Sequence, residues 1–401
     1  MKHGYILSFI MTCILIAGCK KQTDSGTDGQ SEFYAIDYEQ CFETEKQMAI
    51  SEIADTVEYI ELKTPEDIIV TRIWDVKQLD DYLLIHARLD VYLFHTNGQF
   101  IRQIGRLGQG PGEYIVPVNV EIDHKKKEII ISDTEKMLFY DLDGNFLRNK
   151  KFKFKSSTDL GLSDSILWIS RSITTGRYKY TAVAISLQQY TGDTLAYIPN
   201  PLYGKFQETG NTATVEMPFT KKYYYRNDSL YFKGDVFSDT IWKLSGLHTE
   251  PYACINMGKY GMPLEYEPWY SSYDTYIKNN GRYWGVSSIV EDDQYFFLLS
   301  QNRSSDKDDL RPKYIVYDKQ QKQGFYVKDS KGEGLTDDIL GGPPVWPYWI
   351  SDEYYIDMIT ASELLKHTKD DAFTPREPLK EMLSRINSED NDLIILCRRK
   401  K

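Results

Sequence analysis

The chain lacks the short sequence motifs that mark many catalytic and metal sites. It has 6 His in 401 residues, and it contains no HExxH zinc motif, no GxSxG nucleophile motif and no phosphate-binding GK[ST]. The acidic stretch Asp306–Asp309 lacks the alternation and the Gly of a calcium loop. Local sequence therefore predicts no catalytic residue, no metal ligand and no particular cofactor. A site gathered in a channel from single residues of different strands would leave no such motif.

Cysteines are also few. The five are Cys13, Cys19, Cys41, Cys254 and Cys397, and no two are spaced as CxxC. If Cys13 leaves with a signal peptide and Cys19 is modified, three remain, an odd number for an oxidising compartment. Two interpretations stay open: buried free thiols, or a disulfide between Cys41 and Cys397.

Basic residues are outnumbered. The chain has 48 Lys and Arg against 59 Asp and Glu, a formal net charge of −11. Removal of residues 1–18 would take away one more Lys and no acid. Such an acidic surface repels polyanions, so we expect no nucleic-acid partner.

Long apolar runs are missing except at the N-terminus. Tyr5–Ala17 is apolar and follows a basic start, but a membrane-spanning helix needs roughly 20 apolar residues. The pattern is typical of a secretory signal peptide over residues 1–18. Ile16–Cys19 has the small residues and the Cys of a bacterial lipobox. We therefore predict that Cys19 is lipidated, with an ordinary signal sequence as the alternative.

The segment after Cys19 is polar and rich in Gly, and residues 19–33 are interpreted as a flexible tether. Acyl chains on Cys19 would hold the protein to a membrane, because each buried methylene contributes about 0.8 kcal/mol. In some gut anaerobes an acidic tract directly after the Cys resembles a surface-export signal. This chain lacks that tract and has Lys20 and Lys21 there. The expected location is the outer membrane, with the periplasmic face slightly favoured over the cell surface.

What the sequence does contain is a repeated hairpin. Val91–Phe100 and Met137–Phe146 each run from an apolar strand into a polar turn with Gly98 or Gly144, and a Phe two residues later restarts a strand. The two glycines are 46 residues apart. A period of that length with about four short strands per unit is typical of propeller blades.

Further strands and two helices follow from residue patterns. We expect helices at Ala361–Thr368 and Pro378–Ile386, where apolar residues recur every three or four positions, as a short insertion in the last blade. Six apolar runs are interpreted as inner strands of six blades: Tyr82–Ile85, Glu128–Ile131, Ser165–Ile169, Ser229–Phe232, Gln294–Leu299 and Glu353–Ile356.

A propeller must close its ring, because an open sheet edge invites aggregation. We expect the C-terminal strand Asn391–Arg398 to meet the N-terminal stretches Tyr34–Asp37 and Thr56–Leu62. The predicted fold class is thus all-β, a six-bladed β-propeller over residues 34–401.

Four segments carry a family resemblance: Ile53–Leu62, Gly105–Tyr114, Gly341–Pro347 and Glu389–Ile394. In them the chain resembles the six-bladed β-propeller lipoproteins of Gram-negative gut anaerobes, which are distantly similar to NHL-repeat and TolB-type propellers. The resemblance covers nearly all of the mature chain. It implies the fold and secretion, and it implies no activity.

Candidate binding residues come from loops of unusual composition. Gly105–Tyr114 is rich in Gly and is expected to connect two blades, with Glu113 as a hydrogen-bond acceptor. Aromatic residues, which include 31 Tyr and 7 Trp, gather at Tyr223–Arg226, Trp269–Tyr273 and Trp346–Trp349. Flat rings with a polar edge suit sugars and peptides, although any of these rings could instead pack between blades. We predict a pocket at a channel mouth with contacts from Glu113, Arg226, Trp346 and Trp349.

We expect a non-catalytic binding or interaction protein that is anchored in the cell envelope and takes part in glycan or nutrient handling. Its expected partners are the membrane, through Cys19, and a carbohydrate, peptide or envelope-protein ligand. The alternative is a propeller enzyme, a lyase, lactonase or hydrolase, with its site in the central channel.

Overall fold

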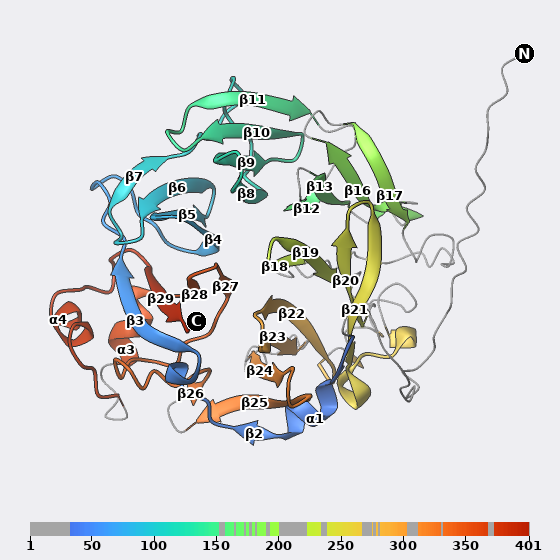
Figure 1. The fold of residues 1–401 in the computed structure, drawn as a ribbon. Helices are drawn as coiled ribbons and strands as arrows, with labels where there is room; N and C mark the ends of the chain where they lie inside the picture. Colours follow the sequence, from blue (N-terminus) through green and yellow to red (C-terminus); the bar gives the residue numbers. More distant parts are fainter. Residues whose placement is uncertain are drawn as a thin grey trace, which may run out of the picture. The chain divides into compact units, whose positions relative to one another are not determined.

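A computed structural model shows six small antiparallel sheets arranged in a ring, a six-bladed β-propeller (Figure 1). The structure describes the following residues: 33–151, 157–163, 166–171, 174–175, 179–180, 183–189, 193–199, 223–233, 239–266, 275, 278–279, 281–302, 312–329, 332–367 and 373–400. Within these ranges no helix is both long and apolar enough to cross a membrane. The predicted signal peptide and Cys19 lie outside the described residues.

The first three blades follow one another along the chain. Blade 1 consists of β4 (Ile73–Leu79), β5 (Tyr82–Ala87), β6 (Asp90–His95) and β7 (Phe100–Gln103). Blade 2 consists of β8 (Asn119–Asp123), β9 (Glu128–Ser132), β10 (Lys136–Asp141) and β11 (Phe146–Lys151). Blade 3 consists of β12 (Ser157–Ser163), β13 (Ile166–Arg171), β16 (Val183–Gln189) and β17 (Thr194–Pro199), with a small hairpin of β14 (Thr174–Thr175) and β15 (Lys179–Tyr180).

The other three blades receive strands from the N-terminus. Blade 4 has β18 (Tyr223–Arg226), β19 (Ser229–Lys233), β20 (Thr240–Ser245), β21 (His248–Asn256) and, as a fifth strand, β1 (Tyr34–Asp37). Blade 5 has β22 (Trp284–Glu291), β23 (Tyr295–Asn302), β24 (Lys313–Asp318), β25 (Gln323–Asp329), β26 (Gly332–Glu333) and β2 (Glu45–Lys46). Blade 6 has β27 (Trp349–Ile350), β28 (Tyr354–Ile359), β29 (Leu393–Arg399) and β3 (Ala54–Glu61).

Short helices lie at the edges of this ring. Helix α1 (Tyr38–Glu43) separates β1 from β2, and α3 (Ala361–His367) and α4 (Leu379–Leu383) lie between β28 and β29. The predicted helical insertion in the last blade is confirmed, and it lies outside the ring in Figure 1. Helix α1 was not predicted. Single 3-10 turns occur at η1 (Ile50–Glu52), η2 (Gly258–Tyr260) and η3 (Leu264–Tyr266).

The repeated hairpin is the outer half of a blade, as predicted. Val91–Phe100 covers β6 except its first residue and reaches the first residue of β7, and Met137–Phe146 covers the same part of β10 and β11. Gly98 and Gly144 have φ values of 84° and 73°, in the left-handed region that favours Gly. A side chain at Gly98 would also collide with the carbonyl oxygen of Glu61.

The six apolar runs form the second strands of the blades, so they are inner strands of their sheets, as interpreted from the sequence. They correspond to β5, β9, β13, β19, β23 and β28, and in each sheet another strand lies closer to the axis. These strands are apolar because they pack on both faces. In β9, Ile129 and Ile131 pack toward blade 1 and Ile130 toward blade 3, so consecutive residues are apolar. The innermost strands face the channel and carry more polar residues.

Strand β3 closes the ring. It pairs antiparallel with β29 from Leu393 opposite Glu61 to Arg399 opposite Ala54, so the closure predicted for Thr56–Leu62 is confirmed. The part of that prediction that concerns Tyr34–Asp37 was wrong. These residues form β1, which pairs in parallel with β21 of blade 4.

The arrangement of the blades determines which cysteines can form a disulfide. Cys41 lies in α1, against Gly324 of blade 5, whereas Cys397 lies in β29 of blade 6. Cys41 and Cys397 are both free thiols. The Cys41–Cys397 disulfide is therefore wrong, because the two residues belong to different blades. Burial raises the pKa of Cys41 to about 12 and that of Cys397 well above its usual range, so both thiols stay protonated.

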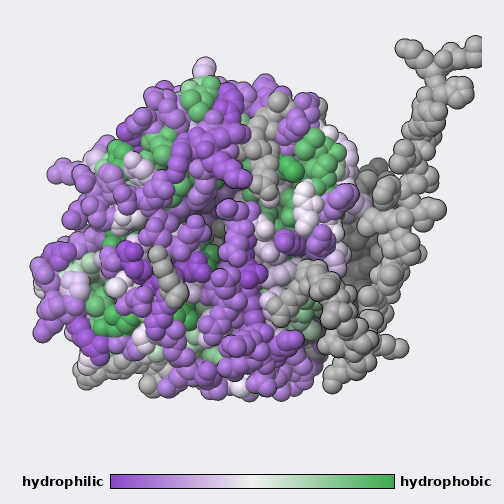
Figure 2. Space-filling model, in the orientation of Figure 1, coloured by the Kyte–Doolittle hydropathy of each residue, from purple (hydrophilic) through white to green (hydrophobic). Residues whose placement is uncertain are grey.

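The surface agrees with the acidic composition. In the face shown in Figure 2, hydrophilic residues predominate and hydrophobic residues form separate patches. The apolar residues are concentrated instead in clusters between neighbouring blades, such as the one that joins blades 1 and 2 through Leu84, Leu93, Ile122 and Leu138.

Candidate functional site: a pocket on the propeller axis

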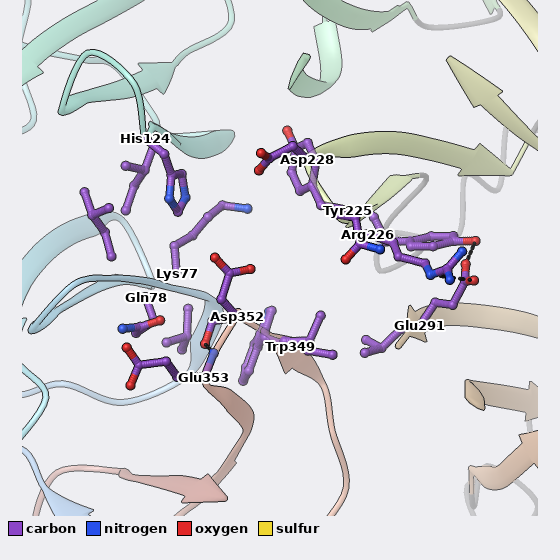
Figure 3. Close-up of a pocket in the computed structure, with 18 of the residues that line it drawn as sticks. Lys77, Gln78, His124, Tyr225, Arg226, Asp228, Glu291, Trp349, Asp352 and Glu353 are labelled. Carbon is purple, nitrogen blue, oxygen red and sulfur yellow. Dashed lines mark hydrogen bonds and ion pairs between the residues drawn. The ribbon is translucent and has the colours of Figure 1, made fainter. Parts of the chain in front are cut away.

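A pocket of about 340 Å³ lies where the C-terminal ends of the six innermost strands meet. Every blade contributes to its wall (Figure 3). The lining residues are Val76–Asp80, Glu121–Lys125, Leu162, Ser163, Tyr224–Asp228, Ile289–Asp293, Tyr348–Glu353 and Arg399. A ligand at this place would touch residues that are far apart in the sequence.

The alternation of strand residues places polar side chains in this wall. In β8, Val120 and Ile122 pack into the cluster between blades, whereas Glu121 and Asp123 line the channel side of the same strand. Strand β22 ends in the same way, with Glu291 lining the pocket. Side chains of opposite charge thus reach one narrow space from different blades.

Lys77 forms a buried charge cluster on one wall. Its Nζ lies 3.2 Å from Asp75 Oδ2 and 2.9 Å from Glu121 Oε1, and Tyr223 donates a hydrogen bond to the same Glu121 oxygen. Burial lowers the pKa of Lys77, but the charges of Asp75 and Glu121 outweigh burial and raise it above its usual value. The ammonium is therefore charged at neutral pH and cannot act there as a base or a nucleophile.

Glu291 forms a second cluster on the opposite wall. It accepts hydrogen bonds from Tyr224, Tyr252 and Lys319, and Arg226 Nε lies 3.5 Å from its Oε1. Burial, followed by the Glu291 charge, raises the pKa of Tyr224 and Tyr252, so both phenols remain donors. The Glu291 carboxylate has its acceptor capacity used by the protein itself.

Arg226 reaches from that cluster to the pocket rim. Its guanidinium donates to Tyr252 at 3.0 Å and to Asp293 Oδ1 at 3.1 Å. Neighbouring Asp292 accepts a hydrogen bond from Tyr355 of blade 6 and the backbone N–H groups of Gln294 and Tyr295. These contacts hold the ends of blades 4, 5 and 6 together, so the pocket wall is preorganised.

Trp349, Asp228, Asp352 and His124 surround the opening in Figure 3. Trp349 is the first residue of β27 and packs beside Tyr348, at 5.9 Å between ring centroids. Asp228 belongs to the β18–β19 turn and Asp352 to the β27–β28 turn. Both carboxylates are on exposed residues at the pocket mouth.

Of the four residues predicted from sequence, Arg226 and Trp349 line this pocket. Trp346 does not: it is 3% exposed and packs in the core, with its ring 4.9 Å from that of Tyr314 and 5.7 Å from that of Phe297. Its neighbours Gly341 and Val345 belong to the same loop, which leads from blade 5 into β27.

Glu113 belongs to the connection between blades 1 and 2, away from the pocket lining. Its carboxylate accepts from the backbone N–H of Gly110 and from Arg106 Nε, both at 2.8 Å. The Gly110 contact, followed by Arg106, lowers its pKa. Glu113 thus fastens its own loop, and the expected connection across Gly105–Tyr114 is present.

Other predicted segments cannot be compared. Trp269, Tyr270, Tyr273 and Asp306–Asp309 lie outside the described residues. Among the residues that the structure does describe, no group of three or more His, Cys, Asp or Glu side chains is placed to hold a metal ion.

Sequence reasoning missed the residues that form the pocket's charged walls. Glu121 stands between the apolar residues Val120 and Ile122, whereas Lys77 and Glu291 each follow an apolar residue and precede a polar one. A charged residue between apolar neighbours in a strand indicates a second, polar environment on one face. That signal could have located the channel wall.

The comparison with known proteins identifies the family. The family model described as "Domain of unknown function (DUF4934)" matches residues 33–398. The chain belongs to the DUF4934 family. No relative among the curated proteins matches this DUF4934 chain.

Solved structures support the fold of this DUF4934 chain. A Bacteroides fragilis protein described as exported is 19% identical, with a TM-score of 0.69, and the match covers 92% of this chain and 100% of that one. The extracellular domain of a Bacteroides thetaiotaomicron protein described as a one-component system is 10% identical over 70% of this chain and 30% of that one. Its TM-score of 0.36 is too low to add to the argument.

Proposed function

We propose that this DUF4934 protein is a non-catalytic binding protein of the cell envelope that holds a small polar ligand in the axial pocket. The observation that carries the proposal is the pocket itself, which every blade lines and which Trp349 and Arg226 border. A pocket on the axis is the one place where a small ligand meets residues of all six blades. Its volume of about 340 Å³ lies at the small end of ligand pockets.

The chemistry of the walls supports binding over catalysis. A general base needs a pKa near the working pH and a free lone pair. Glu121 and Glu291 are each held by a buried Lys and by Tyr hydroxyls, and Lys77 is kept charged. These groups stabilise the wall and offer fixed polar edges to a ligand.

The ligand classes that suit the pocket are a carbohydrate of one or two rings and a short peptide. The Trp349 ring can stack on the apolar face of a sugar or on a peptide side chain, and Ser351 and Asn227 offer hydrogen-bonding groups at the mouth. Arg226 has its guanidinium at the rim, where it can donate to a ligand hydroxyl or carbonyl oxygen.

The proposed location is the outer membrane, through lipidation of Cys19 and the tether of residues 19–33. The lipobox-like Ile16–Cys19 motif supports this proposal, as does the similarity to a protein described as exported. The 15 residues from Cys19 to Phe33, fully extended, reach at most about 50 Å. The periplasmic face is the proposed side.

The test is a binding screen with the substitution Trp349→Ala. Carbohydrate and short-peptide libraries are screened by calorimetry, and we expect Trp349→Ala to weaken binding of any hit about tenfold or more, because loss of a buried aromatic contact costs about 1–3 kcal/mol. The matched control is Trp74→Ala, since Trp74 is half-exposed on β4 and does not line the pocket.

Thermal unfolding of both variants checks that the ring stays folded. Equal loss of affinity in the two variants, or unchanged affinity in Trp349→Ala, would remove the pocket as the binding site. Conversion of the bound compound to a product by the wild-type protein would contradict the non-catalytic assignment.

A further inference from the structure

The pocket carries an excess of negative charge. Nine carboxylates line it, against four groups that are permanently cationic. The carboxylates are Asp80, Glu121, Asp123, Asp228, Glu291, Asp292, Asp293, Asp352 and Glu353; the cations are Lys77, Lys125, Arg226 and Arg399. A pocket with this balance attracts cations and repels anions.

Three of these carboxylates have a partner deep in the wall. Glu121 is paired with Lys77, Glu291 with Lys319 and Arg226, and Asp292 accepts from Tyr355. Their charge is neutralised or their oxygens are occupied. A ligand would have to displace an internal contact to use them.

Carboxylates at the rim are also paired with cations. The pairs are Asp80 with Lys127, Asp123 with Lys126, Asp293 with Arg226, and Glu353 with Arg398. These ion pairs are 2.6–3.7 Å long. They fix the turns around the mouth.

Asp228 and Asp352 differ from the other seven. Within the described residues, neither carboxylate takes part in a hydrogen bond or an ion pair of the protein. Arg399, which also lines the pocket, donates to the backbone oxygens of Ser351 and Asp352, at 2.8 Å and 3.4 Å. Two acceptor groups at the mouth are therefore left for a ligand.

These two carboxylates come from different blades and point into the same opening. In Figure 3, Asp228 extends into it from the turn after β18 and Asp352 from the turn after β27, with the Trp349 ring beside Asp352. Asp228 has a φ of 57°, a positive value of the kind that tight two-residue turns require. This turn between β18 and β19 brings the Asp228 side chain to the rim.

We propose that the ligand carries an ammonium group, which Asp228 and Asp352 bind at the pocket mouth against the Trp349 ring. The inference rests on the proposed function and names the chemical class of its ligand. An ammonium group has donors only, so it matches two acceptors without donors, and a neighbouring indole face adds a cation–π contact. Amino sugars and the amines of short peptides share this chemistry.

The test compares ligands that differ only in the charge of the amine. The probes are glucosamine oligosaccharides with their N-acetylated counterparts, and a Lys-containing tripeptide with its fully acetylated form. We expect the charged member of at least one pair to bind at least tenfold more tightly than the acetylated member. Binding of the charged member is expected to weaken when salt rises from 50 to 300 mM, because exposed ion pairs are screened.

The variants are Asp228→Asn and Asp352→Asn, which keep the side-chain shape and remove the charge. Each is expected to weaken binding of the charged probe about three- to tenfold and to leave the acetylated probe unchanged. Asp67→Asn is the matched control, since Asp67 is an exposed acid that does not line the pocket. Its affinity for every probe should equal that of the wild type.

The outcomes separate this inference from the proposed function. If charged and acetylated probes bind equally well and Trp349→Ala weakens both, the pocket binds ligands but does not recognise an ammonium group. If the charged probe binds more tightly but Asp228→Asn and Asp352→Asn have no effect, the assignment to these two residues is wrong. If no probe or library compound binds, the proposed function fails.

Discussion

Asp357 is a carboxylate that the fold buries completely in β28. Its oxygens accept the backbone N–H groups of Trp346, at 2.7 Å, and Met358, at 2.6 Å. Burial raises its pKa from 3.8 to about 7, against the opposing effect of the two N–H contacts. The charge of Glu363 adds to the rise in the pKa of Asp357. The charge of Asp357 in turn helps to raise the pKa of the Cys397 thiol and of the Tyr59 phenol.

The first prediction is that Asp357 makes the folded state less stable as pH rises. Between pH 4 and pH 7 the unfolded carboxyl is ionised while the folded one holds its proton, so the folded state binds more protons. The free energy of unfolding should fall by about 1.4 kcal/mol per pH unit from this group. Urea unfolding from pH 4.5 to pH 8 would measure it.

Asp357→Asn is the comparison, because Asn keeps an oxygen for the Trp346 N–H and cannot ionise. The difference in stability between variant and wild type should grow in favour of the variant as pH rises toward 7, then level off. Parallel stability curves for the two proteins would show that Asp357 has an ordinary pKa.

At the scale of elements, ring closure depends on one strand pair, β3 with β29. Val57 lies directly opposite Cys397 in this pair, and both side chains are buried in the same cluster. Residues directly opposite in antiparallel strands have Cα atoms about 4.5–5.5 Å apart, within the range of a disulfide. A cysteine at position 57 would therefore lie within disulfide range of the native Cys397.

We expect Val57→Cys to form a disulfide with Cys397 on oxidation. The bridge would close a loop of most of the chain and raise the free energy of unfolding by up to about 5 kcal/mol, since it restricts the unfolded state. The measurement is the thermal midpoint with and without reductant. In the control Val57→Cys with Cys397→Ser, reductant should change nothing; equal midpoints in the single variant would show that the bridge does not form.

How far the sequence predicts these elements depends on what each strand packs against. Second strands such as β9 and β23 are apolar on both faces, so they stand out in the sequence. The innermost strands are short or mixed, and β27 has only two residues, so their place came from the structure. Strands β1 and β2 pair with residues more than 200 positions away, which no local pattern can reveal.

The same reasoning applies to the candidate site. Arg226 and Trp349 were predicted from aromatic clusters that were interpreted as loops, whereas Arg226 is the last residue of β18 and Trp349 the first of β27. Trp346, three residues before Trp349, has the same local composition and is buried. Side-chain direction is set by the backbone path between blades 5 and 6, so composition could not separate the two. Asp228 and Asp352 were absent from the predicted site, since single acids in polar turns are common.

At the scale of the whole molecule, the proposed anchor determines where the pocket meets its ligand. We expect Cys19→Ser to abolish labelling by a fatty-acid analogue and to release the protein from the membrane fraction. The reason is that the domain would then lose the acyl chains that hold it to the bilayer. Cell fractionation with immunoblotting measures this, and Cys41→Ser is the control that removes a thiol but keeps the anchor.

Continued labelling and membrane association of Cys19→Ser would show that another part of the chain holds the protein in place. If the wild-type protein is soluble and unlabelled, the proposal of a lipid anchor is wrong. Neither result would affect the binding tests, which use the isolated protein.

The N-terminal segment of the domain runs along the outside of blades 4, 5 and 6 as β1, β2 and β3 before the chain enters blade 1 (Figure 1). Its partners are β21, β25 and β29, and the last of these is almost the final part of the chain to be synthesised. Chains emerge N-terminus first, and contacts between distant residues form slowly because a long loop must close. The first strands to leave the ribosome, or to cross a membrane, therefore wait unpaired for the last ones. Strand β3 is therefore made early but can pair only when β29 has been made. A chain truncated before β29 has no partner for β3.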